Sequence, residues 1–191
     1  MIRSWVQRAK HASTNLPNGE IIFDAYSALL TVVWRENWTG ACHDTSALLY
    51  MLLSELGCSP TLVTGEVKAP AGIFDHSWVE LDSKIYDVAI GFPGEDGHYV
   101  GPSVFASLNI DTGEPTELTF GVRSPTGLDD VGRFVAHSTL DEYSKIQNVH
   151  ASIWALTPIV ASICGLSLTS EDLRGKYGNV MRQIRGQEAC P

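Results

Sequence analysis

Three residues that lie far apart in the chain could together carry out nucleophilic chemistry: Cys42, His76 and Asp87. A cysteine thiolate is a strong nucleophile, a neighbouring imidazole can give and take a proton, and a carboxylate can hold that imidazole in orientation. Such a set attacks a carbonyl carbon and forms a thioester, and the reaction needs no cofactor. The question is whether the predicted elements bring the three side chains together.

Cys42 falls at the first turn of a predicted helix over residues 42–56, which Gly57 closes. Five residues share one apolar stripe of this helix: Cys42, Leu49, Leu52, Leu53 and Leu56. The unpaired amides and the dipole at a helix N-terminus favour a thiolate over a thiol. The pattern therefore predicts an activated cysteine that faces the core side.

The other two residues fall on a predicted hairpin with strands over residues 76–81 and 84–90. A two-residue turn between them places Trp78 opposite Asp87, with His76 two residues further along on the same face. His76 and Asp87 are then diagonal neighbours, about 7–8 Å apart at the backbone and within side-chain reach. A four-residue turn would keep this relation, and a three-residue turn would destroy it.

The remaining pattern predicts a mixture of helices and strands. A helix is expected over residues 23–35 with Asp24 as its cap, and a strand over residues 61–67 ended by a turn cluster at 68–72. Residues 91–127 are rich in glycine and proline, which favours loops around short strands at 103–108 and 117–122. Helix signals in the C-terminal third are capping boxes at Thr139 and Thr169, a start at Thr157-Pro158, and a stripe of Leu173, Tyr177, Val180 and Ile184.

Several motifs, in this order, resemble the core of bacterial transglutaminase-like proteins. They are GACHDTSALL at residues 40–49, LSELG at 53–57, VTGEV at 63–67, DHSWVE at 75–80 and YD at 86–87. The family's pattern is similar: G-x-C before a hydrophobic helix, L-x-x-L-G, a strand ending near V-x-G, H-x-W-V-E and a closing aspartate. The resemblance implies a papain-like architecture in which Cys42, His76 and Asp87 form the triad.

We therefore expect an α+β, papain-like or transglutaminase-like single domain over residues 1–191. A Cys-bearing helix packs on an antiparallel sheet that carries His and Asp, with a catalytic core at about 23–122 and a helical C-terminal extension at about 128–191. The predicted activity is that of a cysteine hydrolase or acyltransferase on peptide or carboxamide bonds, with a peptidase as first choice. A transglutaminase or glutamine deamidase is the alternative, and a non-catalytic protein-binding module with a vestigial triad is the second alternative.

Nearby residues could complete the site. The backbone amide of Cys42 could donate to the oxyanion, with Asn37 or Trp38 as a second donor, while Trp78 could fill the core or wall the cleft. A metal site is the rival interpretation, and its ligands would be Cys42, His43 and Asp44 with His76, Asp87 or His98. Adjacent helix residues diverge, so no metal is predicted. His43 and Asp44 are expected on the solvated side or stabilising the first turn.

The composition limits the classes of partner that the chain is expected to bind. The 191 residues carry a formal charge of −9, which disfavours nucleic acid and anionic membranes and leaves a peptide or protein substrate. The apolar stretch 149–166 is too polar for a membrane span, and no secretory signal follows the basic N-terminus, so a cytoplasmic protein is expected. Four cysteines without a CxxC pair predict free thiols, with Cys58 and Cys164 in the core and Cys190 exposed. The oligomeric state is left open.

Overall fold

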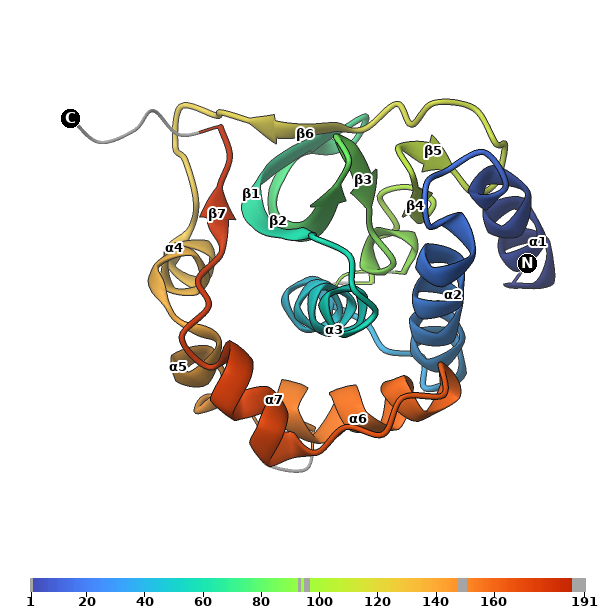
Figure 1. Cartoon of the computed structure of the whole chain (residues 1–191). Helices are drawn as coiled ribbons and strands as arrows, with labels where there is room; N and C mark the ends of the chain where they lie inside the picture. The colour runs from blue at the N-terminus through green and yellow to red at the C-terminus, as the bar shows by residue number, and fades with distance from the viewer. Residues whose placement is uncertain (1, 93, 95–96, 148–150, 187–191) are drawn as a thin grey trace.

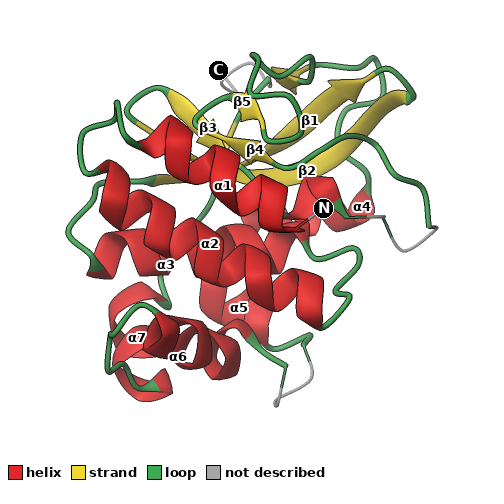
Figure 2. Ribbon diagram, turned by 90° about the vertical axis from the view of Figure 1, so that its right-hand side faces the viewer, coloured by secondary structure: helices red, strands yellow, loops and turns green. Residues whose placement is uncertain are grey.

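The computed structural model describes residues 2–92, 94, 97–147 and 151–186, and it confirms the α+β class (Figures 1 and 2). A curled sheet forms one layer and the helices lie beneath and beside it. In chain order the elements are α1 (Ile2–Ser13), α2 (Gly19–Arg35), α3 (Cys42–Glu55), β1 (Thr61–Ala69), β2 (Gly72–Leu81), β3 (Lys84–Tyr86), a 3₁₀ turn η1 (Ala89–Gly91), β4 (Val104–Phe105), β5 (Leu108–Asn109), β6 (Thr119–Val122), α4 (Asp130–His137), α5 (Leu140–Ser144), α6 (Ile153–Ile163), α7 (Ser170–Tyr177) and β7 (Gln183–Ile184).

The main sheet has the order β3-β2-β1-β6, and β7 also pairs with β1. β1, β2, β3 and β6 pair antiparallel, whereas β7 runs parallel to β1 at Val63 and Thr64. β6 meets β1 further along, from Glu66 to Lys68. The C-terminal part of the chain therefore returns to the sheet and completes it beside the strand that follows the Cys-bearing helix.

The hairpin between β2 and β3 has the predicted two-residue turn. Asp82 and Ser83 both have positive φ, 50° and 59°, which fits the twist of a tight hairpin. The register pairs Leu81 with Lys84 and Val79 with Tyr86, as expected. The second strand is shorter than predicted, because Asp87 bridges to Val104 and the chain then turns into η1 instead of continuing to residue 90.

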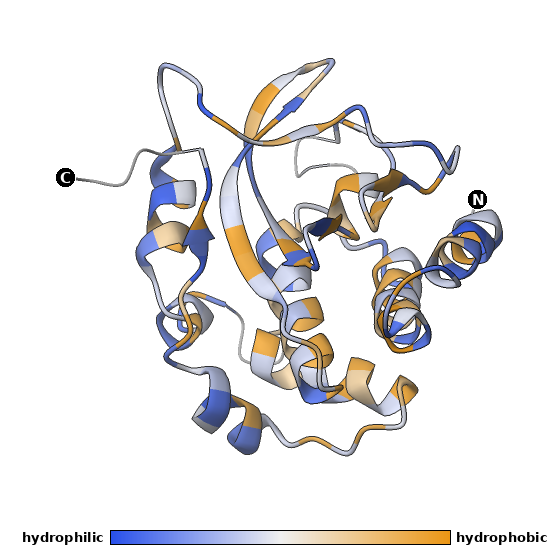
Figure 3. Cartoon of the chain, turned by 45° about the horizontal axis from the view of Figure 1, so that its top comes forward, coloured by the Kyte–Doolittle hydropathy of each residue, from blue (hydrophilic) through white to orange (hydrophobic). Residues whose placement is uncertain are grey.

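Helix α3 lies at the centre of the helical layer, packed against β2, α2 and α6. Figure 3 shows hydrophobic residues along these helices, and many of them belong to the main buried core. The fully buried members of α3 include Ala47, Leu48, Leu52 and Leu53. Because the helix is enclosed on several sides by packed side chains, its first turn is held in a fixed place relative to the sheet.

A smaller apolar cluster lies on the opposite face of β1 and β2 from the main core, because its residues Val63 and Trp78 alternate with Leu62 and Val79 of that core. Its buried residues are Val63, Val67, Ala69, Trp78, Ile90, Val104 and Leu118. The Ile90 amide donates to the Asp87 carboxylate, and Val104 pairs with the Asp87 backbone, so this cluster fixes the segment that carries the carboxylate.

The N-terminal helices differ from the prediction. α2 begins at Gly19 after Asn18, not after Asp24, and α1 was not predicted at all. The four-residue spacing of Trp5, Ala9 and Ser13, all buried, was the signal for α1. Trp5 anchors this helix through a hydrogen bond from its indole N–H to Asp111.

The C-terminal third is mostly helical, as predicted, but its boundaries differ. Thr139 forms the expected capping box with Glu142, whereas Thr157-Pro158 is not a helix start, since α6 begins after Ser152. Pro158 cannot donate to the carbonyl of Trp154, and the Ser170 hydroxyl donates to that carbonyl instead, at 2.8 Å. The predicted stripe is wrong beyond Tyr177, where α7 ends and the chain proceeds to β7.

The strand expected at 117–122 is confirmed with a later start, whereas the strand expected at 103–108 differs from the prediction. The expected strand at 103–108 is a hairpin of β4 and β5, turned at Ala106 and Ser107 with φ of 54° and 65°, and β6 begins at Thr119. Cys42, Cys58 and Cys164 are free thiols, while Cys190 and residues 149–150 lie outside the described residues. In the described part of the chain, no helix combines the length and apolarity needed to cross a membrane.

Candidate active site

Cys42 is the first residue of α3 and is partly exposed. Gly40, two residues earlier, has a φ of 64°, a left-handed conformation that glycine adopts without strain, and it turns the chain into the helix. The residue before the helix, Ala41, gives no side-chain cap. The amides of the first turn are therefore not satisfied by a capping side chain, and their partial positive charge lies beside the sulfur.

His76 and Asp87 meet as the hairpin register predicted. The His76 Nε2 donates to Asp87 Oδ2 at 2.6 Å, and both side chains are almost completely buried. The second carboxylate oxygen of Asp87 accepts from the Ile90 amide at 3.2 Å. Because both oxygens are engaged, the carboxylate is fixed, and Nδ1 of the imidazole is the nitrogen left for Cys42.

The charges of this group favour an ion pair at rest. Burial alone would raise the pKa of the Cys42 thiol, but the charges of His43 and His76 and hydrogen bonds to both imidazoles hold it well below its ordinary value. Burial alone would lower the pKa of His76, but the charges of Asp87 and Cys42 and their hydrogen bonds raise it to about 10. Both pKa directions favour a thiolate on Cys42 and an imidazolium on His76.

The thiol pKa values of the other described cysteines change in the opposite direction from that of Cys42. Cys58 and Cys164 pack against the main core, and burial raises the pKa of each thiol. No imidazole contributes to the pKa of either of these two thiols. Cys42 thus differs from them in its position at a helix start and in its histidine neighbours, which are the features that activate a thiol.

His43 is a member of the site that the sequence did not assign to it. Its Nδ1 lies 2.8 Å from the Ser77 hydroxyl, which donates to the Thr64 hydroxyl at 3.1 Å, and Thr64 donates to the carbonyl of His76 at 3.1 Å. Since the Ser77 proton points to Thr64, His43 Nδ1 is the donor to Ser77, and Nε2 is the nitrogen left for Cys42. The expectation that His43 lies on the solvated side was wrong, because the sheet covers this part of the first turn.

Substitution of Ser77 by alanine should loosen His43 without touching the His76–Asp87 pair. We expect iodoacetamide to label Cys42 about 3-fold more slowly at pH 6, because the thiolate loses part of its support from one imidazole. Mass spectrometry of the labelled peptide over time gives the rate. Ser27→Ala, which removes an exposed hydroxyl on α2, is the matched control and should leave the rate unchanged.

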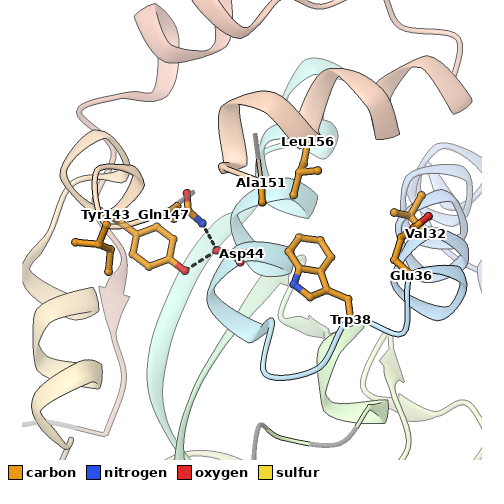
Figure 4. Close-up of a pocket in the computed structure, with 9 residues that line it drawn as sticks. Val32, Glu36, Trp38, Asp44, Tyr143, Gln147, Ala151 and Leu156 are labelled. Atoms are coloured by element: carbon orange, nitrogen blue, oxygen red, sulfur yellow. Dashed lines mark hydrogen bonds between the residues drawn. The ribbon is translucent and has the colours of Figure 1, made fainter. Parts of the chain in front are cut away.

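The C-terminal extension closes over the other side of the same helix turn. Tyr143 and Gln147 both donate to Oδ1 of Asp44 (Figure 4). Arg182 is buried, stacks on the Tyr143 ring at 4.7 Å and donates to the carbonyl of His43 at 3.0 Å. Asp44 is therefore half-buried among donors rather than solvated, and burial, the largest cause, raises its pKa.

Tyr143, Gln147 and Arg182 carry no local signal that could have placed them here. They join the first turn of α3 across roughly a hundred residues or more of chain, and only the path of the extension back to β1 brings them together. His43 and Asp44 did carry a signal, because they sit next to the predicted nucleophile in a helix whose two sides both had to be covered.

The three other predicted site residues lie in different surroundings. Asn37 is exposed with a φ of 47°, and among the described residues its side chain has no hydrogen bond to the triad. Trp38 is half-buried and lines a pocket beside Asp44. Trp78 is buried in the smaller apolar cluster, packs on Phe120 and donates to Glu80 at 3.1 Å, which is the core role. The oxyanion roles of Asn37 and Trp38 stay predictions.

The residues weighed for a metal do not converge on one point in the described part of the structure. His43 and His76 each use one ring nitrogen on a protein partner, and His98 is exposed in the loop before β4. The groups around Cys42 are instead imidazoles that form hydrogen bonds with its sulfur and favour the negative charge on it.

Comparisons of the chain with models of protein families, with curated proteins and with solved structures gave no match, so the site is interpreted on its own geometry.

Proposed function

We propose that this protein is a cysteine hydrolase that cleaves peptide bonds through a thioester on Cys42. The observation that carries the proposal is the arrangement of three side chains: half-buried Cys42 at a helix N-terminus and His76, whose Nε2 is held by the buried Asp87 carboxylate. The lowered pKa of the Cys42 thiol and the raised pKa of His76 agree with this arrangement. A structural cysteine has no need of these partners. The transglutaminase-like assignment and the papain-like architecture belong to the same proposal and are supported by the ordered motifs.

The proposed reaction follows from the positions of the protons. The Cys42 thiolate adds to the carbonyl carbon, and the backbone amide of Cys42 at the start of α3 donates to the oxygen that becomes negative. Nδ1–H of His76 then protonates the amine as the C–N bond breaks, which leaves the acyl group on sulfur. His76, now neutral, takes a proton from water as the water attacks the thioester. The C–S bond breaks, the carboxylic acid product leaves, and the His76 imidazolium and the Cys42 thiolate are regenerated.

Asp87 acts throughout as an orienting group. Its carboxylate keeps Nε2 protonated and aims Nδ1 at the sulfur and the leaving group. The chemistry consumes only water and needs no cofactor. A free thiolate of this kind also suits the reducing cytoplasm, which is the compartment we propose.

The test is to incubate the full chain with a mixture of peptides in H₂¹⁸O and to sequence the products by mass spectrometry. We expect new C-termini that carry ¹⁸O, and we expect none with Cys42→Ala. A fluorescent primary amine is included in a parallel reaction to detect acyl transfer.

Each outcome identifies one activity. Label in glutamate without chain cleavage would mean a glutamine deamidase, and incorporated amine would mean a transglutaminase. Products that are the same with wild type and Cys42→Ala would contradict a Cys42 enzyme, and no product from any mixture would favour the protein-binding module.

A further inference from the structure

A pocket of about 420 Å³ opens beside the first turn of α3, between α2, α5 and α6 (Figure 4). Five of its lining residues are apolar: Val32, Trp38, Ile146, Ala151 and Leu156. The polar end is formed by Asp44, with Tyr143 and Gln147 pointing at its carboxylate. A second carboxylate, Glu36, lies toward α2. The pocket is thus mainly apolar, with a carboxylate at one end.

The Asp44 carboxylate is held in place and still has an oxygen to offer. Tyr143 and Gln147 both bond to Oδ1, and among the described residues no hydrogen bond is made to Oδ2. Half-burial leaves this charge poorly solvated, so a cation entering the pocket would gain more from it than from an exposed carboxylate.

The described lining residues include no lysine, arginine or histidine. The nearby cations are directed elsewhere, since Arg182 lies against the Tyr143 ring and bonds to the His43 carbonyl, and Arg35 pairs with Glu36 at 2.7 Å. An aromatic indole, an aliphatic wall and a terminal carboxylate together fit an ammonium group on an apolar stem of lysine length.

The pocket lies at the same helix start that carries the Cys42 sulfur. Residues two apart at a helix start have Cα atoms about 5.5 Å apart, and Asp44 follows Cys42 by two. Their side chains leave the helix on different sides, so a substrate whose carbonyl lies at the sulfur has to extend a long side chain across the helix start to reach the Asp44 carboxylate. We propose that this pocket binds a lysine-type side chain of the peptide substrate, at the residue next to the cleaved bond or at its neighbour. This inference rests on the proposed function.

The experiment uses peptidyl chloromethyl ketones, which alkylate a thiolate as the C–S bond forms and chloride leaves. Acetyl-Ala-Lys and acetyl-Lys-Ala chloromethyl ketones are compared with their norleucine counterparts, which have a stem of similar length without the ammonium group. Rates of Cys42 labelling are measured at pH 8 by mass spectrometry, and each rate is divided by the iodoacetamide rate of the same protein variant.

We expect one lysine label to react about 10-fold or more faster than its norleucine partner in the wild type, and equally fast in Asp44→Asn. Asp130→Asn, whose side chain is 97% exposed, should keep the preference. Equal lysine and norleucine rates at both positions, or a preference unchanged in Asp44→Asn, would overturn the pocket assignment. Iodoacetamide rates typical of an ordinary thiol would instead count against the proposed function, while the lysine-to-norleucine ratio still reports on the pocket.

Discussion

Replacing His76 by alanine should slow the labelling of Cys42 by iodoacetamide about 10- to 100-fold at pH 6. In the wild type the pKa of the Cys42 thiol is lowered and the pKa of His76 is raised to about 10, and both directions favour the ion pair below pH 10. Without the imidazolium the thiol pKa rises, and an ordinary thiol with a pKa near ~8.5 is only about 0.3% ionised at pH 6. Mass spectrometry of the Cys42 peptide across pH 5–10 gives both profiles.

The pH dependence of the labelling rate distinguishes loss of the ion pair from loss of folding. The gap between the labelling rates of wild type and His76→Ala should narrow as the pH rises toward 10, because more of the variant's thiol becomes ionised. A general loss of folding would instead change the labelling rate at every pH. Cys58 and Cys164, whose pKa values are raised, are internal controls that should label slowly at pH 6 in both proteins. His137→Ala removes an exposed histidine and should behave as wild type. Superimposable profiles for wild type and His76→Ala would rule out the ion pair.

Asp87→Asn should have the second large effect, a loss of about 100-fold or more in peptide turnover. The asparagine has the size of the aspartate, and its oxygen can still accept from the Ile90 amide. It removes the negative charge that favours the imidazolium, so the His76 pKa should fall well below the wild-type value of about 10. The NMR titration of the His76 ring reports that shift directly and needs no substrate.

The control for this variant is structural. The backbone of Asp87 bonds to Val104 in both directions at 2.8 Å, which the substitution does not touch, so the melting temperature should change little compared with Asp130→Asn. A His76 ring that still titrates near pH 10 in Asp87→Asn would mean that another group supplies its charge. Turnover close to wild type would remove Asp87 from the proposed mechanism.

Local patterns in the sequence were sufficient for the parts of the site whose geometry is set over short distances. The apolar residues and Gly57 predicted the helix α3 and placed Cys42 in its first turn, because a helix start and a glycine stop are local signals. The structure buries α3 on more than one side, which a single apolar stripe did not indicate. The alternation of β2 and the two-residue turn fixed the pairing of His76 with Asp87, because the side-chain period of a strand is two. These relations depend on backbone geometry within one helix or one hairpin.

Tertiary structure decided what surrounds that core. Asp87 ends its strand early because Val104 and Ile90 offer its backbone and side chain other partners. The placement of His43 depends on the sheet above it, and the pocket at Asp44 depends on Tyr143 and Gln147, about a hundred residues away in the chain. Such contacts are chosen by which faces remain uncovered once the elements pack, and residue spacing does not encode that choice.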